Sequence, residues 1–556
     1  MSTTISILGG VGLFLLGMTV MTEGLKALAG SSLRTVLGKA AATPLSGLFW
    51  GAVVTLLVQS SSATTMTTIG LVSAGLLTFP QGLGLVFGAN VGTTGTGWLV
   101  ALVGVRVSLS SYALPMIFVG ALVKLLGGGR IAAAGAALAG FALVLFGLTT
   151  LQQGMGGLAE SLHPSDLPAV LGAPGVGWLS GSFGLMALVV AGLVMTAVMQ
   201  SSTASIAVTL SAYYAGAIGV DQGCALIIGQ NIGTATSSAM AAIGASTTAK
   251  RLAVAYMLFK VIAALIALVS FPVVIRLLVR AESAIDGVTL LAAYHTAYNV
   301  VGVLVLMPVI GWFTRFVERL LPDRTSPLTR CLDPAALATP VAAVEAVRRT
   351  VARAIELVCE STGAALAPAI GGPSRPAKSA GPVTEIADAL GKAQDFISEV
   401  SGPPETEDEQ RRRASTFHAL DHATRLAEMA CEQPDIAPAT KGGPEDARAA
   451  QLCAEAMKNA ASVVREVAEE SALSEHAAPI RFEETPDALS ALTKLEQCAK
   501  TLGELRSAHR SATLSAAATG ALTADKAIVR VDKVRWLEAL AHHAWRSAAH
   551  LVGRGG

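Results

Sequence analysis

Charged side chains are scarce in the first part of the chain. Residues 1–320 contain 20 of its 79 Asp, Glu, Lys and Arg side chains, and residues 321–556 contain the other 59. Apolar runs close to the roughly 20 residues that span a bilayer follow one another in the first part with short loops. A water-soluble core does not need such continuous apolarity, so we predict a membrane part followed by a soluble helical part.

Metal-binding and catalytic signatures are also missing. The six cysteines are widely spaced, and no CxxC or Cys/His metal spacing occurs. No paired acids and no nucleophile with a nearby base stand out, and these absences argue against an enzyme. Scattered cysteines in the soluble part favour a reducing compartment, although a role as small core residues explains them equally well. The formal net charge of +1 gives no indication of a nucleic-acid partner.

The apolar part contains an internal repeat. A QSSS run that begins at Gln59 is matched by a QSST run that begins at Gln200, and GANVGTT around Asn90 is matched by GQNIGTA around Asn231. The two Gln positions and the two Asn positions are separated by the same offset in the sequence. Two motifs rarely keep one offset by chance, so we infer that the membrane part contains one unit twice.

The repeat also predicts how the two copies are oriented. Residues 13–28 are echoed by residues 143–158, and each copy crosses the membrane three times if the QSSS element, 46–77 in the first copy, is a re-entrant hairpin. An odd number of crossings inserts the second copy upside down. We therefore expect one membrane repeat over 1–128 and a second over 129–320, which includes a final transmembrane helix.

The distribution of basic residues tests this topology. With the N-terminus outside, most Lys and Arg residues of the membrane part fall inside, and the long outer loop 153–180 contains none. Only Arg106, Arg276 and Arg280 fall on the wrong side. Because cytoplasmic loops carry an excess of Lys and Arg, this bias places the soluble part in the cytoplasm.

Hydroxyl and amide side chains interrupt the apolar runs at the two Gln motifs. Such groups are costly at membrane depth unless they line a polar cavity or find partners. A Ser or Thr hydroxyl can donate to an oxyanion or offer a lone pair to sodium, and Gln can do either. A broken helix adds free backbone N–H groups for an anion and free carbonyls for sodium. The two motifs therefore predict a site for a small oxyanion and a small cation.

Helix packing offers a second interpretation of these residues. Ser and Thr are ordinary in membrane helices, but two hydroxyl runs at matched positions favour a binding site. The Gly-flanked Asn90 and Asn231 fit a helix break with an oxygen for a cation, or a packing patch. Glu23 fits a solvated acid at the membrane rim as well as a functional one. His295 and Asn299, one turn apart, fit a structural pair as well as a ligand pair.

At these motifs the chain resembles the type II sodium/phosphate cotransporter family, in its bacterial branch fused to a PhoU-like domain. The resemblance is carried by QSSSAT from Gln59, QSSTAS from Gln200, GANVGTT from Gly88, GQNIGTA from Gly229 and YHTAYN from Tyr294. In that family the paired motifs form the substrate and sodium site between two inverted repeats. The chain departs from the family at Phe259-Lys260, because the family often has an aromatic-Asn pair where this chain has Lys260. The lysine either argues against a role of that helix in ion binding or adds a fixed positive charge near the path of an anion.

The resemblance implies which residues line the site. Phosphate would be bound by the groups that open each motif: Gln59, Ser60, Ser61, Ser62, Gln200, Ser201, Ser202 and Thr203. Sodium would be bound by the groups that follow them and by the second pair of motifs: Thr64, Thr65, Ser205, Asn90, Thr93, Asn231 and Thr234. No metal beyond sodium and no cofactor is implied.

The soluble part contains a duplication of its own. His422-Ala-Thr-Arg425 is echoed by His543-Ala-Trp-Arg546. Two bundles of about three helices each fit this echo, and we place the domain at 335–553. It resembles PhoU, whose repeated bundles bind metals or partners through acidic helix motifs, but those acidic spacings are not clear in this sequence.

These expectations describe an all-α, polytopic membrane protein with two inverted-topology repeats and re-entrant hairpins, followed by a soluble helical-bundle domain. The resemblance implies a sodium-coupled secondary active transporter that imports inorganic phosphate by alternating access around a midplane site. The alternative is a membrane phosphate sensor that signals through the PhoU-like domain. We expect multi-pass insertion in the inner (cytoplasmic) membrane with the C-terminal domain in the cytoplasm. Its partners would be phosphate, sodium and the lipid bilayer, and homo-oligomer formation stays open.

Overall fold

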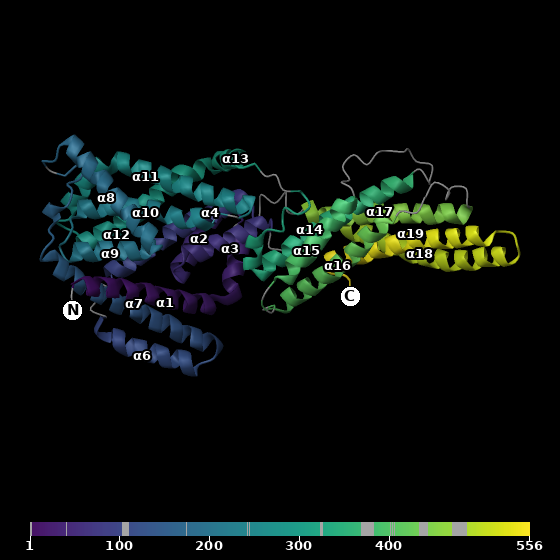
Figure 1. Cartoon of the computed structure of the whole chain (residues 1–556), viewed down its shortest axis with the longest axis horizontal. Coiled ribbons are helices and arrows are strands. Elements are labelled where there is room, and N and C mark those ends of the chain that lie inside the picture. The colour runs from purple at the N-terminus through teal and green to yellow at the C-terminus, as the bar shows by residue number, and fades with distance from the viewer. Residues whose placement is uncertain are drawn as a thin grey trace. The chain divides into compact units, whose positions relative to one another are not determined.

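Helices make up the computed structural model of the chain (Figure 1). It describes residues 3–322 except 41, 103–109, 174, 242 and 244, and residues 326–555 except 368–382, 401, 403, 405, 433–442 and 470–485. No strand occurs among these residues, so the predicted all-α class is confirmed for them. The chain divides into unit 1, with residues 1–69 and 77–323, and unit 2, with residues 70–76 and 324–556.

The helices before residue 323 follow one another with short connections. The first group is α1 (Thr3–Ala40), α2 (Pro44–Val58), α3 (Ser61–Ser73), α4 (Phe79–Thr93), α5 (Gly95–Leu99), α6 (Ser110–Leu126) and α7 (Gly129–Ala159). The second group is η2 (Pro164–Asp166), α8 (Trp178–Met199), α9 (Ser202–Tyr214), α10 (Val220–Ala241), α11 (Thr247–Ala281), α12 (Gly287–Leu306), η3 (Met307–Val309) and α13 (Ile310–Leu320).

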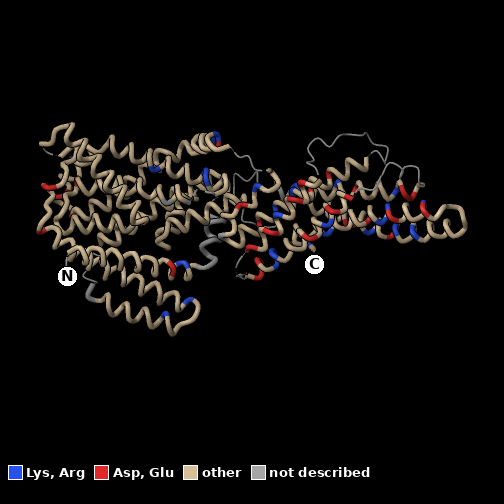
Figure 2. Tube along the Cα trace, in the orientation of Figure 1, with Lys and Arg blue, Asp and Glu red and all other residues tan. Residues whose placement is uncertain are grey.

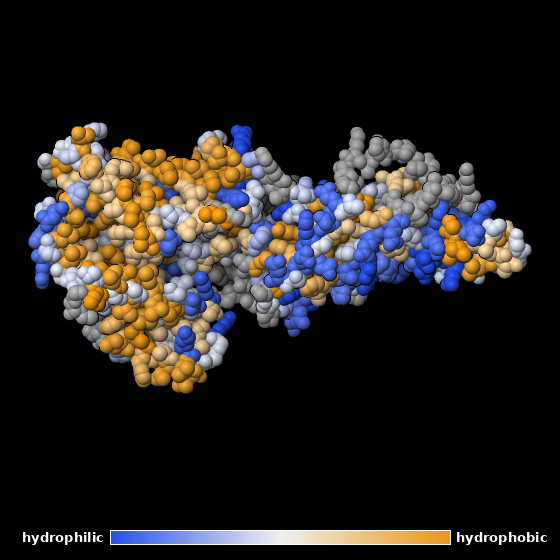
Figure 3. Space-filling view, in the orientation of Figure 1, coloured by the Kyte–Doolittle hydropathy of each residue, from blue (hydrophilic) through white to orange (hydrophobic). Residues whose placement is uncertain are grey.

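Six segments of the described chain are long and apolar enough to cross a membrane. They are Thr3–Ala29, Phe79–Leu102, Gly129–Ala159, Trp178–Met199, Thr247–Ala281 and Gly287–Leu320. Charged residues are sparse along unit 1 and frequent along unit 2 (Figure 2), and apolar residues cover much of the visible surface of unit 1 (Figure 3). The prediction of a polytopic membrane protein is therefore confirmed.

Local sequence signals explain where several of these helices begin and end. Thr43 accepts a hydrogen bond from the backbone N–H of Ser46 at the start of α2, and Thr78 accepts one from Gln81 at the start of α4. These reciprocal caps satisfy N–H groups that a helix start leaves without partners. The predicted final helix is divided between α12 and α13, because Pro308 in η3 has no N–H to continue the helix.

Glycines allow α2 to pack closely against α4, and α8 against α10. A Cβ atom built on Gly88 would lie 2.0 Å from the carbonyl oxygen of Leu48, and one on Gly229 would lie 1.8 Å from that of Val189. The two glycines have the same sequence offset as the two Gln motifs, and so do their two partners. The close contact between α2 and α4 is thus repeated between α8 and α10 at equivalent positions of the two sequence repeats.

The path of the chain around α3 follows from the same contacts. A Cβ atom on Gly84 would lie 2.2 Å from the carbonyl oxygen of Pro44, so the early part of α4 lies beside the start of α2 and the two helices are parallel. At 1.5 Å per residue, α2 is about 22 Å long and α3 about 20 Å. Because α4 starts where α2 starts, α3 must carry the chain back, and α2 and α3 form a helical hairpin.

The first helices of the two sequence repeats, α1 and α7, pack side by side and run in opposite directions. A Cβ atom on Gly10 would lie 2.5 Å from the backbone nitrogen of Leu151, and one on Gly24 would lie 2.5 Å from that of Ala137. Residue numbers therefore rise along α1 as they fall along α7. Two equivalent helices with opposite directions are what an inverted repeat requires.

The described residues of unit 2 form helices joined by turns and short connections, and no strand occurs among them. Its elements are η4 (Pro334–Ala338), α14 (Pro340–Leu366), α15 (Val383–Ser398), α16 (Glu407–Cys431), α17 (Pro444–Glu469), α18 (Pro486–Ala518) and α19 (Ala524–Leu551). The buried carboxylate of Asp446 on α17 binds His509 on α18 (3.0 Å) and Arg530 on α19 (2.5 Å). One acidic side chain thereby ties three helices together.

Buried ionic groups also organise the start of unit 2. Glu345 on α14 is 3% exposed and pairs with Arg348 and Arg349, each at 2.8 Å. Burial alone would raise the pKa of the Glu345 carboxyl, but the two guanidinium groups outweigh it and lower the pKa to about 2. The echoed residues His422 and His543 meet between α16 and α19, with their Nδ1 atoms 3.0 Å apart.

Candidate functional site

The two Gln residues of the repeated motifs stand at two equivalent helix breaks. Helix α2 ends at Val58 and Gln59 has φ 57°, whereas α8 ends at Met199 and Gln200 has φ 50°. They are the only non-glycine residues with positive φ in the described chain. Left-handed backbone is uncommon and mildly strained for such residues, and it clusters at functional positions. The predicted helix breaks are therefore present at both motifs.

Hydrogen bonds fix the first break from both sides. The Gln59 amide nitrogen donates to the carbonyl oxygen of Leu56 (2.5 Å), and its Oε1 accepts from the hydroxyl of Thr96 on α5 (2.6 Å). The Ser60 hydroxyl accepts from the backbone N–H of Ala63 at the start of α3 (3.3 Å). Gln59 thus connects the hairpin to the segment that follows the GANVGTT motif.

The second break repeats this arrangement. The Gln200 amide nitrogen donates to the carbonyl oxygen of Ala197 (2.5 Å), as Gln59 does three residues back in its own helix. The Ser201 hydroxyl accepts from the backbone N–H of Ala204 and caps α9 (3.2 Å). Each motif therefore presents one amide side chain at the bend and the N-terminus of a new helix directly after it.

The hydroxyl groups of the motifs divide into accessible and buried ones. Ser62 is exposed, and the half-buried ones are Ser60, Ser61, Thr65, Ser201, Ser202 and Thr203. Thr64 is 2% exposed and Ser205 is fully buried; their hydroxyls donate to the carbonyl oxygens of Ser60 (3.3 Å) and Ser201 (3.0 Å). The groups predicted to bind phosphate can be reached, while Thr64 and Ser205, predicted for sodium, already have helix partners in this structure.

Asn90 and Asn231, one from each repeat, meet at a third residue. Lys260 on α11 is 1% exposed, and its Nζ donates to Oδ1 of Asn90 (2.5 Å) and to Oδ1 of Asn231 (2.5 Å). Phe259, the residue before it, stacks on Phe87 of α4 with 4.6 Å between ring centroids. The predicted sodium ligands Asn90 and Asn231 are thus brought together, and a lysine amino group lies between them.

Helix α12 completes this polar cluster. The Asn90 amide nitrogen donates to Oδ1 of Asn299 (2.9 Å), whose own amide nitrogen donates to the carbonyl oxygen of His295 (2.8 Å). His295 and Asn299 are both buried. Asn299 is therefore part of the cluster, and His295 supports it through its backbone.

The two threonines of the Asn motifs turn back onto their own helices. Thr93 donates to the carbonyl oxygen of Ala89 (2.8 Å), and Thr234 donates to that of Asn231 (2.6 Å). Thr234 also lies 3.4 Å from the hydroxyl of Tyr256 on α11. Such back-bonding is usual for threonine in helices.

Sequence reasoning did not identify Lys260 as the centre of the cluster. The available signal was a lysine inside the apolar run 247–281, because a charged residue within a membrane segment marks a functional position by default. Among the described residues, no group of three or more His, Cys, Asp and Glu side chains is arranged to bind a metal ion.

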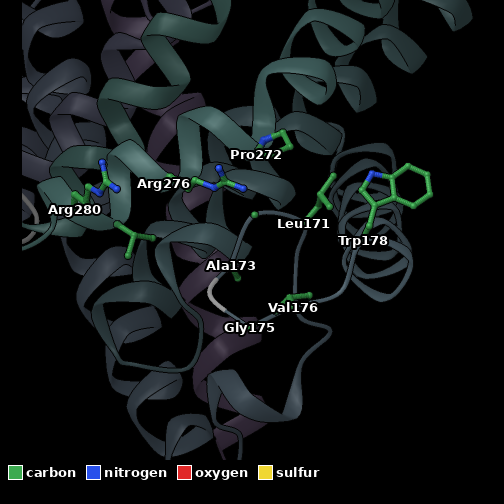
Figure 4. Close-up of a pocket in the computed structure, with 10 residues that line it drawn as sticks. Leu171, Ala173, Gly175, Val176, Trp178, Pro272, Arg276 and Arg280 are labelled. Carbon is green, nitrogen blue, oxygen red and sulfur yellow. The ribbon is translucent and has the colours of Figure 1, made fainter.

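A cavity of about 580 Å³ lies between the 171–178 loop and α11, apart from the motifs (Figure 4). Two of its lining residues are Arg276 and Arg280, which stand one turn apart on α11. They are two of the three basic residues that break the charge bias expected from the predicted topology. None of the residues predicted for phosphate or sodium lines this cavity.

Comparisons with known proteins agree with these features. Residues 13–153 and 182–285 match the family described as Na+/Pi-cotransporter, and these ranges include both Gln breaks, both Asn motifs and Lys260. No solved structure matches the chain.

Individual relatives are similar over different lengths. The uncharacterized protein YqeW of Bacillus subtilis is 27% identical over 311 residues, which are 56% of this chain and 96% of the relative. The putative inorganic phosphate export protein YjbB of Escherichia coli is 28% identical over 350 residues, 62% of this chain and 61% of the relative. The human sodium-dependent phosphate transport protein 2B is 47% identical over 62 residues, 11% of this chain and 9% of the relative. Through its membrane part, over less than half of its length, the chain is therefore similar to the Na+/Pi-cotransporter family.

Proposed function

We propose that the chain is a secondary active transporter that moves inorganic phosphate across a membrane together with sodium. The observation that carries the proposal is the pair of equivalent helix breaks at Gln59 and Gln200, each followed by accessible hydroxyls and a new helix N-terminus. Backbone N–H groups at a helix N-terminus bind anions, and the helix dipole adds to them. Phosphate has the charge and the acceptor oxygens that such a site recognises.

Alternating access is the mechanism that the geometry supports. The antiparallel α1 and α7 support an inverted pair of repeats, and the hairpin α2–α3 and the equivalent break between α8 and α9 support re-entrant elements that meet a site from opposite sides. In transporters of this kind one repeat moves against the other around a fixed site. Such motion would open Gln59, Gln200 and the neighbouring hydroxyls to one side of the membrane at a time.

The direction of net transport depends on the gradients across the membrane. With an inward sodium gradient we propose import of phosphate. Export is the second candidate, because the YjbB relative of Escherichia coli carries that description. Purified protein in sealed vesicles separates the two, because the sodium gradient can be imposed in either direction and labelled phosphate can be followed in each case.

The transport experiment also separates a transporter from a sensor. We expect vesicles with the protein to accumulate many phosphate ions per protein when sodium is present on the side from which phosphate moves. Replacement of sodium by choline should lower this uptake, and vesicles without protein should show none. Binding of about one phosphate per protein without further flux would instead support the sensor that signals through unit 2.

We also propose that unit 2 lies in the cytoplasm and that the connection between α7 and α8 lies outside; the predicted outer loop 153–180 is shorter in the structure because α7 continues to Ala159. His163 in this loop and Cys431 in unit 2 are both exposed. In intact cells, a membrane-impermeant thiol reagent should label His163→Cys in a Cys431→Ser background, and it should label native Cys431 only after the membrane is permeabilised. The opposite labelling pattern would contradict the proposed topology.

A further inference from the structure

We propose that the Lys260 amino group is a resident cation of the transport site and takes the place that a sodium ion would occupy between Asn90 and Asn231. The inference rests on the proposed function and deepens it. It changes the assignment of two predicted sodium ligands, because their side-chain oxygens both accept from Lys260 Nζ at 2.5 Å.

The surroundings of Nζ are those of a cation site. Two amide oxygens, one from each repeat, converge on it, and the ring of Tyr256 lies 5.3 Å away from Nζ to its centroid. Neutral oxygens and an aromatic face are ligands that an alkali cation and an ammonium group share. While Lys260 is in place, a sodium ion at the Asn pair would meet occupied oxygens and a like charge.

The orientation of Asn90 is fixed from a second side. Its amide nitrogen donates to Asn299 of α12 at 2.9 Å, which leaves its Oδ1 directed at Lys260. The Asn231 amide nitrogen is buried and has no hydrogen-bond partner in the described part of the chain. The side-chain oxygen of Asn231 therefore faces the lysine, although this rotamer gives the amide nitrogen no hydrogen bond. A positive charge on Nζ would favour this rotamer because it attracts the amide oxygen.

No carboxylate in the described part of the chain forms an ion pair with Lys260, whose amino group donates to the oxygens of Asn90 and Asn231. The helices packed against α11 are α4, α10, α12 and α13. Helices α4 and α12 contain no Asp or Glu, and α10 contains only Asp221, about 15 Å from Asn231 along the helix. On α13, Glu318 stands between Arg315 and Arg319.

An unbalanced buried charge is costly, and a bound anion removes that cost. Phosphate would supply the missing negative charge if it binds within reach of Lys260. The lysine would then contribute one positive charge to every transport cycle without dissociating. Fewer sodium ions would be needed for each phosphate than in a site where a sodium ion occupies the Asn pair.

Two neutral variants test this role in equilibrium phosphate binding and in vesicle uptake. Lys260→Met removes the amino group and keeps most of the length of the side chain, whereas Lys260→Ala leaves space beside the two amide oxygens. We expect both to bind phosphate roughly ten- to hundredfold more weakly at low sodium, since a hydrogen-bonded charge is lost. A high sodium concentration should restore phosphate binding by Lys260→Ala, and this binding should depend more steeply on sodium than that of the wild type. The same sodium concentration should not restore phosphate binding by Lys260→Met.

A third variant tests the role of the Lys260 amino group if the lysine variants do not fold. Asn231→Asp keeps the size of the side chain, removes no hydrogen bond made by the amide nitrogen and places a carboxylate beside Lys260. It should weaken phosphate binding as Lys260→Met does.

The outcomes separate the two proposals. Wild-type phosphate affinity in Asn231→Asp and in the folded lysine variants, or equal restoration of Lys260→Met and Lys260→Ala by sodium, would overturn the role of Lys260 alone. A wild-type protein that moves no phosphate under any gradient would contradict the proposed function instead.

Discussion

Gln59→Gly and Gln200→Gly are each expected to lower sodium-driven phosphate uptake roughly ten- to hundredfold while the protein still folds. The expected loss follows from removing a hydrogen-bonding partner of a charged ligand, which costs about 1–3 kcal/mol or more. Glycine is chosen because it adopts the φ values of 57° and 50° without strain. The backbone bend should therefore survive, and the loss of uptake would report on the side chain.

Two further variants sharpen this test. Gln59→Glu should lower phosphate uptake more than Gln59→Gly does, because it places a negative charge beside the phosphate. Gln153→Ala is the matched control, since Gln153 is an exposed glutamine in the membrane helix α7 and belongs to neither Gln motif. Uptake into vesicles and thermal unfolding in detergent are measured for each variant. Near-normal uptake in both glycine variants would mean that the breaks contribute only backbone geometry, and the proposed site would be wrong.

Gly229→Ala and Gly88→Ala are expected to prevent or severely weaken folding of the membrane unit. The added methyl groups would lie 1.8 Å from the carbonyl oxygen of Val189 and 2.0 Å from that of Leu48. A carbonyl oxygen of a packed helix cannot rotate away as a side chain can, so whole helices must separate. We expect a loss of about 3 kcal/mol or more in the free energy of unfolding, at the upper end for overpacking.

Gly12→Ala is the matched control for these glycines. Gly12 also lies in a long membrane helix, but nothing lies within 4 Å of a Cβ atom built on it. Alanine there should be neutral or stabilise the protein by up to about 1 kcal/mol, because glycine is a poor helix former. The yield of monodisperse protein and its melting temperature are the measurements. Gly229→Ala and Gly88→Ala protein as stable as wild type would show that α8–α10 and α2–α4 are not packed as closely as described.

The repeat could be predicted from the sequence because it is a property of the chain itself. The shared offset of the Gln and Asn motifs needs no coordinates, and two hydroxyl runs at matched positions inside apolar segments predict a helix break at each motif. The structure places both Gln59 and Gln200 in left-handed backbone at such breaks. Charge distribution and the length of the apolar runs likewise separate the membrane part from the helical part after it, because both follow from local composition.

The partners of individual side chains could not be predicted in the same way. Thr64 and Ser205 have the chemistry of sodium ligands, yet they donate to carbonyl oxygens one turn back, a choice that depends on the surroundings of each hydroxyl. Lys260 is far from Asn90 and Asn231 in the sequence, and only the packing of α11 against α4 and α10 brings its amino group between them. Composition and periodicity determine where helices form and which residues avoid water. Which oxygens meet which cation is decided by how the helices pack, because a hydrogen bond is lost over a shift of less than an ångström.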